Sequence, residues 1–166
     1  MEPKYDPELV KPLWEPLVTV GFESITTGEG VREALARPGT LLCLINSVCG
    51  CAARNARPGA ALSLQGTPIP DHLITVFAGM DHGAVAEARA AMIGVPPSSP
   101  SFALFSNGKL VDSVGRHEIE GMTALELAGH LRTLYNSHCT RTGPSVPPEV
   151  FDTVEFAMMC SSSLLS

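Results

Sequence analysis

The fold is decided by residues 41–54, which read LLCLINSVCGCAAR. The first half of this run is apolar and rich in strand-forming residues, and it stops at the triplet Cys49-Gly50-Cys51. The residues behind the triplet favour a helix, so two thiols lie where a buried strand passes into a helix N-terminus. Unpaired backbone N–H groups and the positive end of the helix dipole stabilise an anion at such a place. We therefore expect a lowered thiol pKa here.

The two cysteines are expected to have different roles. Cys49 lies just before the helix or caps it, so its thiolate is the expected nucleophile of disulfide exchange. Cys51 falls in the first turn, where we expect its side chain to be more shielded, and it is the expected resolving thiol. A disulfide across a one-residue gap needs a bent middle residue, because its two Cα atoms must lie roughly 4.4–6.8 Å apart. Gly50 tolerates that bend, and the bridge would be strained and easily reduced.

Composition and charge exclude several classes of function. The chain has 166 residues, 45% of them hydrophobic, and 11 Lys and Arg against 17 Asp and Glu give a net charge of −6. One domain of this size can bury a core without disulfides or metal. The absence of a basic run argues against nucleic acid or a membrane surface as a partner. Five cysteines, with no apolar leader at Met1, predict a cytoplasmic protein with reduced thiols.

Apolar spacing and turn signals predict alternating strands and helices. A helix over 6–20 comes first, and a helix over 123–135 with a capping box comes last. Pro58 predicts a bend in the helix behind the thiols, and Asn107-Gly108 predicts a tight hairpin. Between the two outer helices we expect strands over 22–26, 41–48, 73–78, 102–105 and 110–115, and helices over 27–36, 52–65 and 84–92.

This order of elements predicts the fold class. β-α-β units impose parallel strand pairs, the hairpin adds an antiparallel pair, and helices must cover both faces of the sheet. We therefore predict a thioredoxin-like three-layer α/β/α architecture with a mixed central sheet, an N-terminal helical extension and a C-terminal tail. The expected domain covers residues 1–139. Residues 140–166 are expected to form an extension that is partly helical or disordered, with a short helix over 150–159 that docks Phe151, Val154 and Phe156.

Five blocks of this sequence resemble the bacilliredoxin family of thioredoxin-like bacterial proteins with a Cys-Gly-Cys site. The blocks stand in the family's order within residues 6–139, at 46–53, 56–58, 76–79, 97–101 and 116–121. The resemblance implies that Cys49 takes bacillithiol from S-bacillithiolated proteins, which carry it as a mixed disulfide. It also implies that free bacillithiol and a flavin-dependent reductase recycle the adduct, with no tightly bound cofactor, and that the protein has weak disulfide-isomerase activity.

The tail after Cys139 departs from the family pattern. It includes a further cysteine, Cys160. The tail leaves the oligomeric state open, a homodimer included, and it leaves open whether a third thiol takes part in the redox chemistry.

Two loops are expected to complete the thiol site. Pro100 matches the cis-proline that thioredoxin-like folds place opposite the active thiols, where the backbone of Ser99 pairs with a substrate chain. The alternative is an ordinary loop proline. Arg116 and His117 follow the last strand and are expected to orient an anionic ligand, such as the carboxylates of bacillithiol. Their alternative is a solvated turn.

Two further arginines and two further cysteines can be assigned expected roles, either at the site or in the core. Arg54 and Arg57, on the helix behind the thiols, are further candidates for the anionic ligand. Cys43 lies in mid-strand and is expected in the core. Many thioredoxins place a buried carboxylate in this strand, and none occurs between residues 41 and 48. Cys139 is expected either to pack at a helix end or to attack a neighbouring disulfide.

Rival functions remain open. A general protein disulfide reductase or isomerase would use the same two thiols. A zinc or iron–sulfur site would instead use Cys49 and Cys51 as two of its ligands. The remaining ligands would come from His138, Cys139 or Cys160, although these lack the close pairs typical of structural metal sites, so the prediction is no metal site. A thiol-sensing adaptor without turnover is the third alternative. Hydrolysis and phosphoryl transfer find no motif in the chain.

Overall fold

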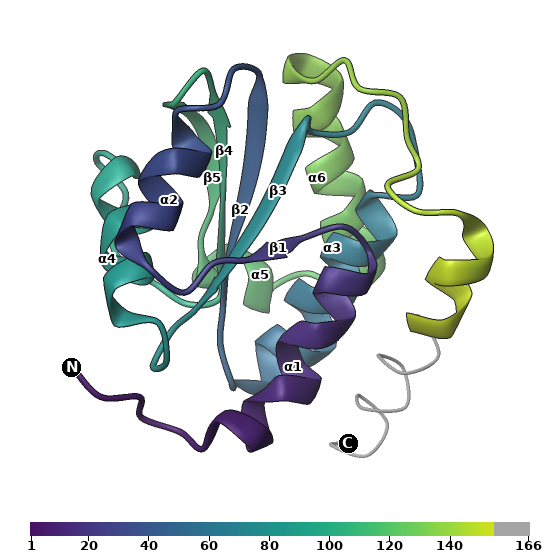
Figure 1. Ribbon diagram of the computed structural model, residues 1–166. Helices are drawn as coiled ribbons and strands as arrows, with labels where there is room; N and C mark the ends of the chain where they lie inside the picture. Colours follow the sequence, from purple (N-terminus) through teal and green to yellow (C-terminus); the bar gives the residue numbers. More distant parts are fainter. Residues whose placement is uncertain (155–166) are drawn as a thin grey trace.

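The central strand β2 (Thr40–Asn46) is buried along its whole length, as its apolar run predicts. In the computed structural model, which describes residues 1–154, β2 lies between a parallel neighbour, β3 (His72–Phe77), and an antiparallel one, β4 (Ser101–Ser106). β1 (Glu23–Ser24) pairs with β3 in parallel, and β5 (Lys109–Val114) pairs with β4 in antiparallel orientation. The sheet order is β1-β3-β2-β4-β5 (Figure 1), so the predicted mixed sheet is confirmed.

Helices cover both faces of this sheet. α1 (Pro7–Thr19), α3 (Arg57–Ser63) and α6 (Ala124–His138) lie on one face (Figure 1). α2 (Gly28–Leu35) and α4 (His82–Ala91) lie on the other. The three-layer α/β/α architecture is therefore confirmed, with α1 as the predicted N-terminal helix. Within residues 1–154, no helix combines the length and apolar character needed to cross a membrane.

Alternate residues of β2 face the two layers, because successive side chains of a strand point to opposite faces. Leu42 and Leu44 join the core formed with α1, α3 and α6. Leu41, Cys43 and Ile45 join the core formed with α2 and α4. Burial raises the pKa of the Cys43 thiol to about 12. The prediction that Cys43 is a core residue is confirmed.

Local signals predicted several element ends correctly. The hydroxyls of Thr27 and Thr123 each accept a hydrogen bond from the backbone N–H three residues on, at 3.0 and 3.1 Å, and so cap α2 and α6. The turn between β4 and β5 has a positive φ at both Asn107 (49°) and Gly108 (81°), as a tight two-residue hairpin requires.

Two short elements differ from the sequence prediction. The strand expected over 22–26 is reduced to the two residues of β1 at the edge of the sheet. A five-residue helix, α5 (Arg116–Glu120), follows β5, where a turn was one alternative. The carboxylate of Glu118 accepts the N–H of Gly115 at 2.9 Å and holds the start of α5. A helix this short has no apolar period from which it could be recognised.

The helix expected over 52–65 is divided into two parts. A π-helical turn, η1 (Ala52–Ala56), comes first, and the N–H of Arg57 donates to the carbonyl five residues back. α3 follows with Pro58 in its first turn. Pro58 has no N–H to donate to the carbonyl of Arg54, so the regular pattern fails at this point. The irregularity takes the form of a π turn, and the bend expected at Pro58 stays a prediction.

The beginning of the C-terminal tail packs on the core of α1, α3 and α6. Residues 148–154 are helical, and Phe151 and Val154 are buried in that core. This agrees with the first part of the helix expected over 150–159. The rest of that expected helix, with Phe156, lies outside the described residues.

Candidate redox site

The two thiols lie at the carboxyl end of β2, where the chain enters a helix that begins at Gly50. The carbonyl of Cys49 accepts the N–H groups of Ala52 (3.1 Å) and Ala53 (3.3 Å), so Cys49 is the residue before the helix, as predicted. Both cysteine side chains have intermediate exposure. The expectation that Cys51 is the more shielded thiol is wrong, because its side chain lines an open hollow.

Hydrogen bonds to sulfur decide the ionisation of Cys49. Burial alone would raise the pKa of its thiol. The Cys51 thiol, with its sulfur 2.8 Å away, and the Ser47 hydroxyl, at 3.1 Å, donate to the Cys49 sulfur. The N–H of Ala52 and the charge of Arg116 act in the same direction. The net effect is a pKa of Cys49 below its usual value, as the sequence predicts.

Cys51 shows the opposite behaviour. Burial, the hydrogen bond that it gives to Cys49 and the negative charge of Cys49 together raise the pKa of Cys51 to about 11. Glu120 adds to this increase, and Arg116 opposes it. Cys49 therefore loses its proton first, while Cys51 keeps its own.

Gly50 gives room to a neighbouring arginine. Its backbone is helical and its φ is not positive. A Cβ at this position would lie 3.0 Å from Nη2 of Arg54. The cysteines are free thiols here, so the bend that a Cys49–Cys51 disulfide requires of Gly50 stays a prediction.

The loop before β4 has the expected cis-proline. The Ser99–Pro100 peptide bond is cis, and Pro100 is buried. Ser101, the next residue, pairs with Ile45 of β2, so this loop lies beside the carboxyl end of β2. The carbonyl of Ser99 accepts a hydrogen bond from Nη1 of Arg116 at 3.4 Å. The backbone N–H of Ser99 has no hydrogen-bond partner among residues 1–154. That N–H is free to pair with a substrate backbone.

Arg116 lines two neighbouring hollows, whereas His117 lines only one of them. The first, of about 500 Å³, lies beside the thiols and is lined by Gly50, Cys51, Arg54, Asn55, Arg116 and Glu120. Arg116 is held there by an ion pair of 2.7 Å with Glu120. His117 instead lines a neighbouring hollow of about 420 Å³, next to residues 94–98. The structure therefore brings Arg116 to the thiols and places His117 outside the thiol hollow.

The two candidate arginines of the helix are separated. Arg54 lines the thiol hollow, but Arg57 is only 6% exposed and points into the protein. Nη1 of Arg57 donates to the side-chain oxygen of Asn46 (3.1 Å) and to the carbonyl of Ser47 (2.9 Å). The expectation that Arg57 contacts an anionic ligand is therefore wrong.

Three polar residues at the site were not singled out from the sequence. Asn46 and Ser47 follow the apolar run and precede the first thiol, and that position was the available signal. Asn55 donates to the carbonyls of Ile119 (2.8 Å) and Met122 (2.7 Å), and so ties the π turn to the end of α5.

Cys139 lies at the other end of the sheet. Its thiol contacts Thr40, the first residue of β2, and burial raises its pKa. Thr40 and the loop of Cys49 lie at opposite ends of β2. The length of this strand, at about 3.3 Å per residue, is roughly 20 Å. Cys139 therefore packs at a helix end, as one alternative predicted, and it cannot reach the other two thiols.

The same distance excludes Cys139 and its neighbour His138 as ligands of a metal bound at Cys49 and Cys51. In the described part of the chain, no group of three or more His, Cys, Asp and Glu side chains is arranged to hold a metal ion. Cys160, the other proposed ligand, lies outside that part.

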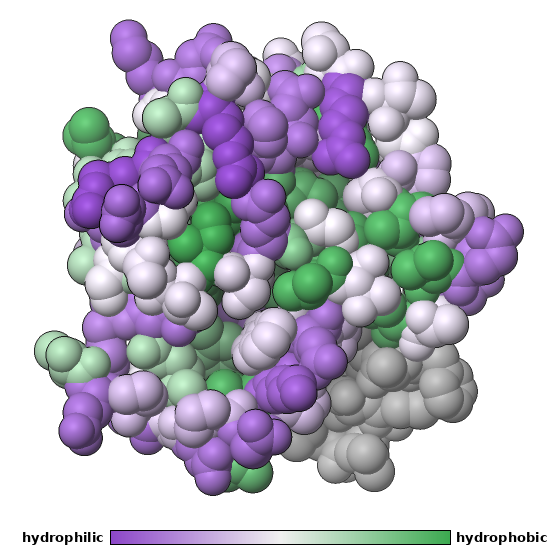
Figure 2. All heavy atoms as spheres, in the orientation of Figure 1, coloured by the Kyte–Doolittle hydropathy of each residue, from purple (hydrophilic) through white to green (hydrophobic). Residues whose placement is uncertain are grey.

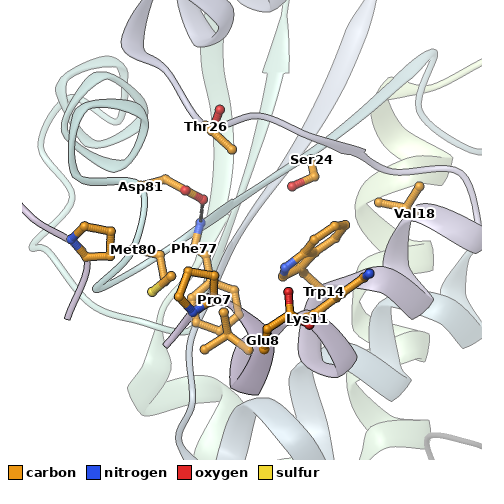
Figure 3. Close-up of a pocket in the computed structure, with 12 residues that line it drawn as sticks. Pro7, Glu8, Lys11, Trp14, Val18, Ser24, Thr26, Phe77, Met80 and Asp81 are labelled. Carbon is orange, nitrogen blue, oxygen red and sulfur yellow. Dashed lines mark hydrogen bonds between the residues drawn. The ribbon is translucent and has the colours of Figure 1, made fainter. Parts of the chain in front are cut away.

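A larger hollow, of about 820 Å³, lies between α1, β1 and the end of β3 (Figure 3). Trp14, Phe77 and Met80 give it an apolar lining, and neither a cysteine nor an arginine lines it. The carboxylate of Asp81 accepts the N–H of Phe77 at 3.1 Å, and burial raises its pKa. Figure 2 shows hydrophobic and hydrophilic side chains next to one another on one face of the molecule. This hollow is separate from the thiol hollow.

Comparison with known protein families shows the class of enzyme to which this chain belongs. A family model described as disulphide isomerase matches residues 5–139, which include all five strands and both thiols. Two thiols of unequal pKa at the start of a helix are suited to disulfide exchange. The protein is a thiol–disulfide oxidoreductase of the thioredoxin-like fold.

Curated relatives narrow this class. The bacilliredoxin of Geobacillus kaustophilus is 51% identical over 122 residues, which is 74% of this chain and 84% of the relative. The bacilliredoxins of Cytophaga hutchinsonii (48%) and Bacillus thuringiensis (47%) match over 132 residues, which is 80% of this chain and 98% and 92% of theirs. The chain belongs to the bacilliredoxin family, as its sequence blocks indicate.

Solved structures give looser matches. A thioredoxin of Malassezia sympodialis covers 71% of this chain and 90% of its own, with a TM-score of 0.47 and 17% identity. The thioredoxin-like domain of Arabidopsis NCP covers 78% of this chain and 82% of its own, with a TM-score of 0.47 and 15% identity. The fold assignment therefore rests on the sheet order and on the family.

Proposed function

We propose that this protein removes bacillithiol from proteins that carry it as a mixed disulfide. The Cys49 thiolate attacks the bacillithiol sulfur, and the disulfide bond to the substrate cysteine breaks. The substrate leaves as a thiolate and is thereby reduced, while Cys49 is oxidised to a mixed disulfide with bacillithiol. The observation that carries this proposal is the unequal pair of thiols, with the pKa of Cys49 lowered and that of Cys51 raised to about 11.

Two routes can then regenerate Cys49. In the first, Cys51 loses its proton and attacks the Cys49 sulfur, which releases bacillithiol as a thiolate and leaves a Cys49–Cys51 disulfide. In the second, free bacillithiol attacks the bound bacillithiol sulfur, which releases the Cys49 thiolate and bacillithiol disulfide for a flavin-dependent reductase. The distance of 2.8 Å between the two sulfur atoms supports the first route.

The thiol hollow supports binding of the bacillithiol part of the substrate. Arg54 forms no ion pair with any residue of 1–154, and Arg116 shares its charge with Glu120. The two guanidinium groups are suited to the carboxylates of bacillithiol, since Arg binds carboxylates in a planar, bidentate manner. His117, in the neighbouring hollow, would then meet the substrate protein. Because this exchange needs a compartment in which thiols are kept reduced, we propose that the protein acts in the cytoplasm.

A second candidate function is disulfide isomerisation on proteins without bacillithiol. It is favoured by the free N–H of Ser99 beside the cis-proline, which can bind an extended substrate chain whatever its adduct. The description of the matching family model points the same way.

Intact-protein mass spectrometry tests the first proposal. The native chain and the variants Cys49→Ala, Cys51→Ala and Cys139→Ala are incubated with a bacillithiol-carrying protein and quenched with a thiol trap. We expect Cys51→Ala to gain one bacillithiol, because its adduct cannot be resolved, and Cys49→Ala to gain none and to leave the substrate modified. Cys139→Ala is the matched control and should behave as the native chain does.

A Cys49→Ala variant that still takes up bacillithiol would refute the assignment of the nucleophile. If no variant takes up bacillithiol but the native chain rearranges a scrambled protein disulfide, the isomerase function is correct instead.

A further inference from the structure

Arg57 is a buried cation without a carboxylate partner. Its side chain is 6% exposed, beneath the loop that carries the first thiol. No Asp or Glu within residues 1–154 forms an ion pair with it. A buried charge is costly unless other groups compensate for it. The groups around Arg57 must therefore supply that compensation.

Two oxygen atoms of the residues that shortly precede Cys49 in the chain accept hydrogen bonds from Arg57. Nη1 donates to the side-chain oxygen of Asn46 (3.1 Å) and to the carbonyl of Ser47 (2.9 Å). The same Asn46 oxygen accepts the N–H of Ser47 at 2.9 Å, and the amide nitrogen of Asn46 donates to the carbonyl of Leu13 in α1 (3.0 Å). Arg57 thus fixes the residue that presents its hydroxyl to Cys49.

We propose that Arg57 is a positioning residue of the redox site, which holds Ser47 against Cys49 and compensates the charge of the Cys49 thiolate from inside the protein. The charge of Cys49 acts on Arg57 through space, and the thiolate forms when the Cys49 thiol gives its proton to solvent. The inference rests on the proposed role of Cys49 as nucleophile, but it does not depend on the identity of the adduct.

Other groups also act on Cys49 and differ from Arg57 in their exposure. Arg116 reaches the thiols from α5 on the solvent side, where it is paired with Glu120. Cys51, Ser47 and the N–H of Ala52 donate hydrogen bonds from the loop and the helix. Arg57 differs because it is buried, and water and salt screen its charge less. Its positive charge therefore acts more strongly on the Cys49 thiolate than an exposed charge at the same distance would.

The guanidinium group suits this position better than an ammonium group. Burial lowers the pKa of Arg57 to about 10, while the charge of Cys49 raises it, so Arg57 stays protonated at neutral pH. A lysine at this place, with an ordinary pKa of about 10.4, would be brought closer to losing its charge by the same burial.

The test is the pH profile of Cys49 alkylation by iodoacetamide, with the labelled residue located by fragmentation mass spectrometry. We expect Arg57→Gln to raise the midpoint for Cys49 by about one pH unit. Arg57→Lys should restore part of that shift, because it keeps the charge. Arg132→Gln is the matched control, since Arg132 also donates to a backbone carbonyl, that of Leu62, at 2.7 Å. It should lower the stability without moving the midpoint.

A second measurement observes Arg57 in the native chain and therefore does not depend on the folding of an Arg57 variant; Cys49→Ser serves as its control. The side-chain nitrogen resonances of Arg57, followed by NMR, should shift with an inflection at the midpoint of Cys49, and this inflection should disappear in Cys49→Ser.

Two results would overturn the proposal: a folded Arg57→Gln with an unchanged midpoint, or Arg57 resonances that do not respond to Cys49. A native midpoint at the ordinary cysteine pKa would instead refute the proposed role of Cys49 itself.

Discussion

Removal of the Ser47 hydroxyl is the most direct test of what lowers the pKa of Cys49. It donates to the Cys49 sulfur at 3.1 Å and accepts the Cys49 N–H at 3.3 Å. Ser47 is 7% exposed, so water has little access to its place. The substitution Ser47→Ala removes both hydrogen bonds and keeps the Cβ atom and the backbone geometry.

The size of the effect follows from the charge on the acceptor. A hydrogen bond to a charged group contributes about 1.5–3 kcal/mol, and one pKa unit corresponds to about 1.4 kcal/mol. Cys49 is partly exposed, so water replaces part of the lost interaction. We therefore expect Ser47→Ala to raise the pKa of Cys49 by about one unit, the lower end of that range.

This shift has opposite effects on the amount of thiolate and on its reactivity. At a pH below the Cys49 pKa of both the native chain and Ser47→Ala, the variant has about ten-fold less thiolate than the native chain. Each thiolate of the variant is about three-fold more nucleophilic, because its pKa is higher. We expect exchange to be about three-fold slower there, and about three-fold faster at a pH above both values.

The assay is the exchange rate of Cys49 with a small disulfide over a range of pH. The buried Ser63 provides the control, since its hydroxyl donates to the carbonyl of Ala60 at 2.7 Å, away from the thiols. Ser63→Ala should change the stability and leave the Cys49 profile unmoved. If the midpoint in Ser47→Ala stays where the native one lies, or if Ser63→Ala moves it equally, the hydrogen bond to sulfur does not set the pKa.

Two further predictions concern other residues. The Cys43 pKa rises from 9.0 to about 12 on folding, so only the unfolded chain ionises between these values, and the native protein should lose about 1.4 kcal/mol of stability per pH unit in that window. Urea unfolding at two pH values should show a smaller loss for Cys43→Val, and equal losses would contradict the burial argument. Arg54→Ala should slow uptake of bacillithiol about three-fold while leaving exchange with a neutral disulfide unchanged, and Arg54→Lys should recover part of the rate. Slowing with both disulfides would show that Arg54 acts on the thiols.

The sequence by itself determined those parts of the protein whose causes are local. The apolar run before Cys49 predicts a buried strand, and the helix-favouring residues behind it place Cys49 at a helix start, as the structure confirms. The left-handed turn at Asn107-Gly108 is likewise set by residue type. Alternation of strands and helices then restricts the sheet to few topologies. These features sufficed to predict the fold and the two thiols.

The tertiary structure decided which side chains share a place. Arg54 and Arg57 are three residues apart, a spacing that puts both on one face of a regular helix. The π turn between them rotates the chain, so that Arg54 lines the thiol hollow and Arg57 is buried under Ser47. Cys139 is a plausible third thiol in the sequence, yet the length of β2 keeps it away. Burial and distance depend on contacts between segments far apart in the chain, and no local pattern encodes them.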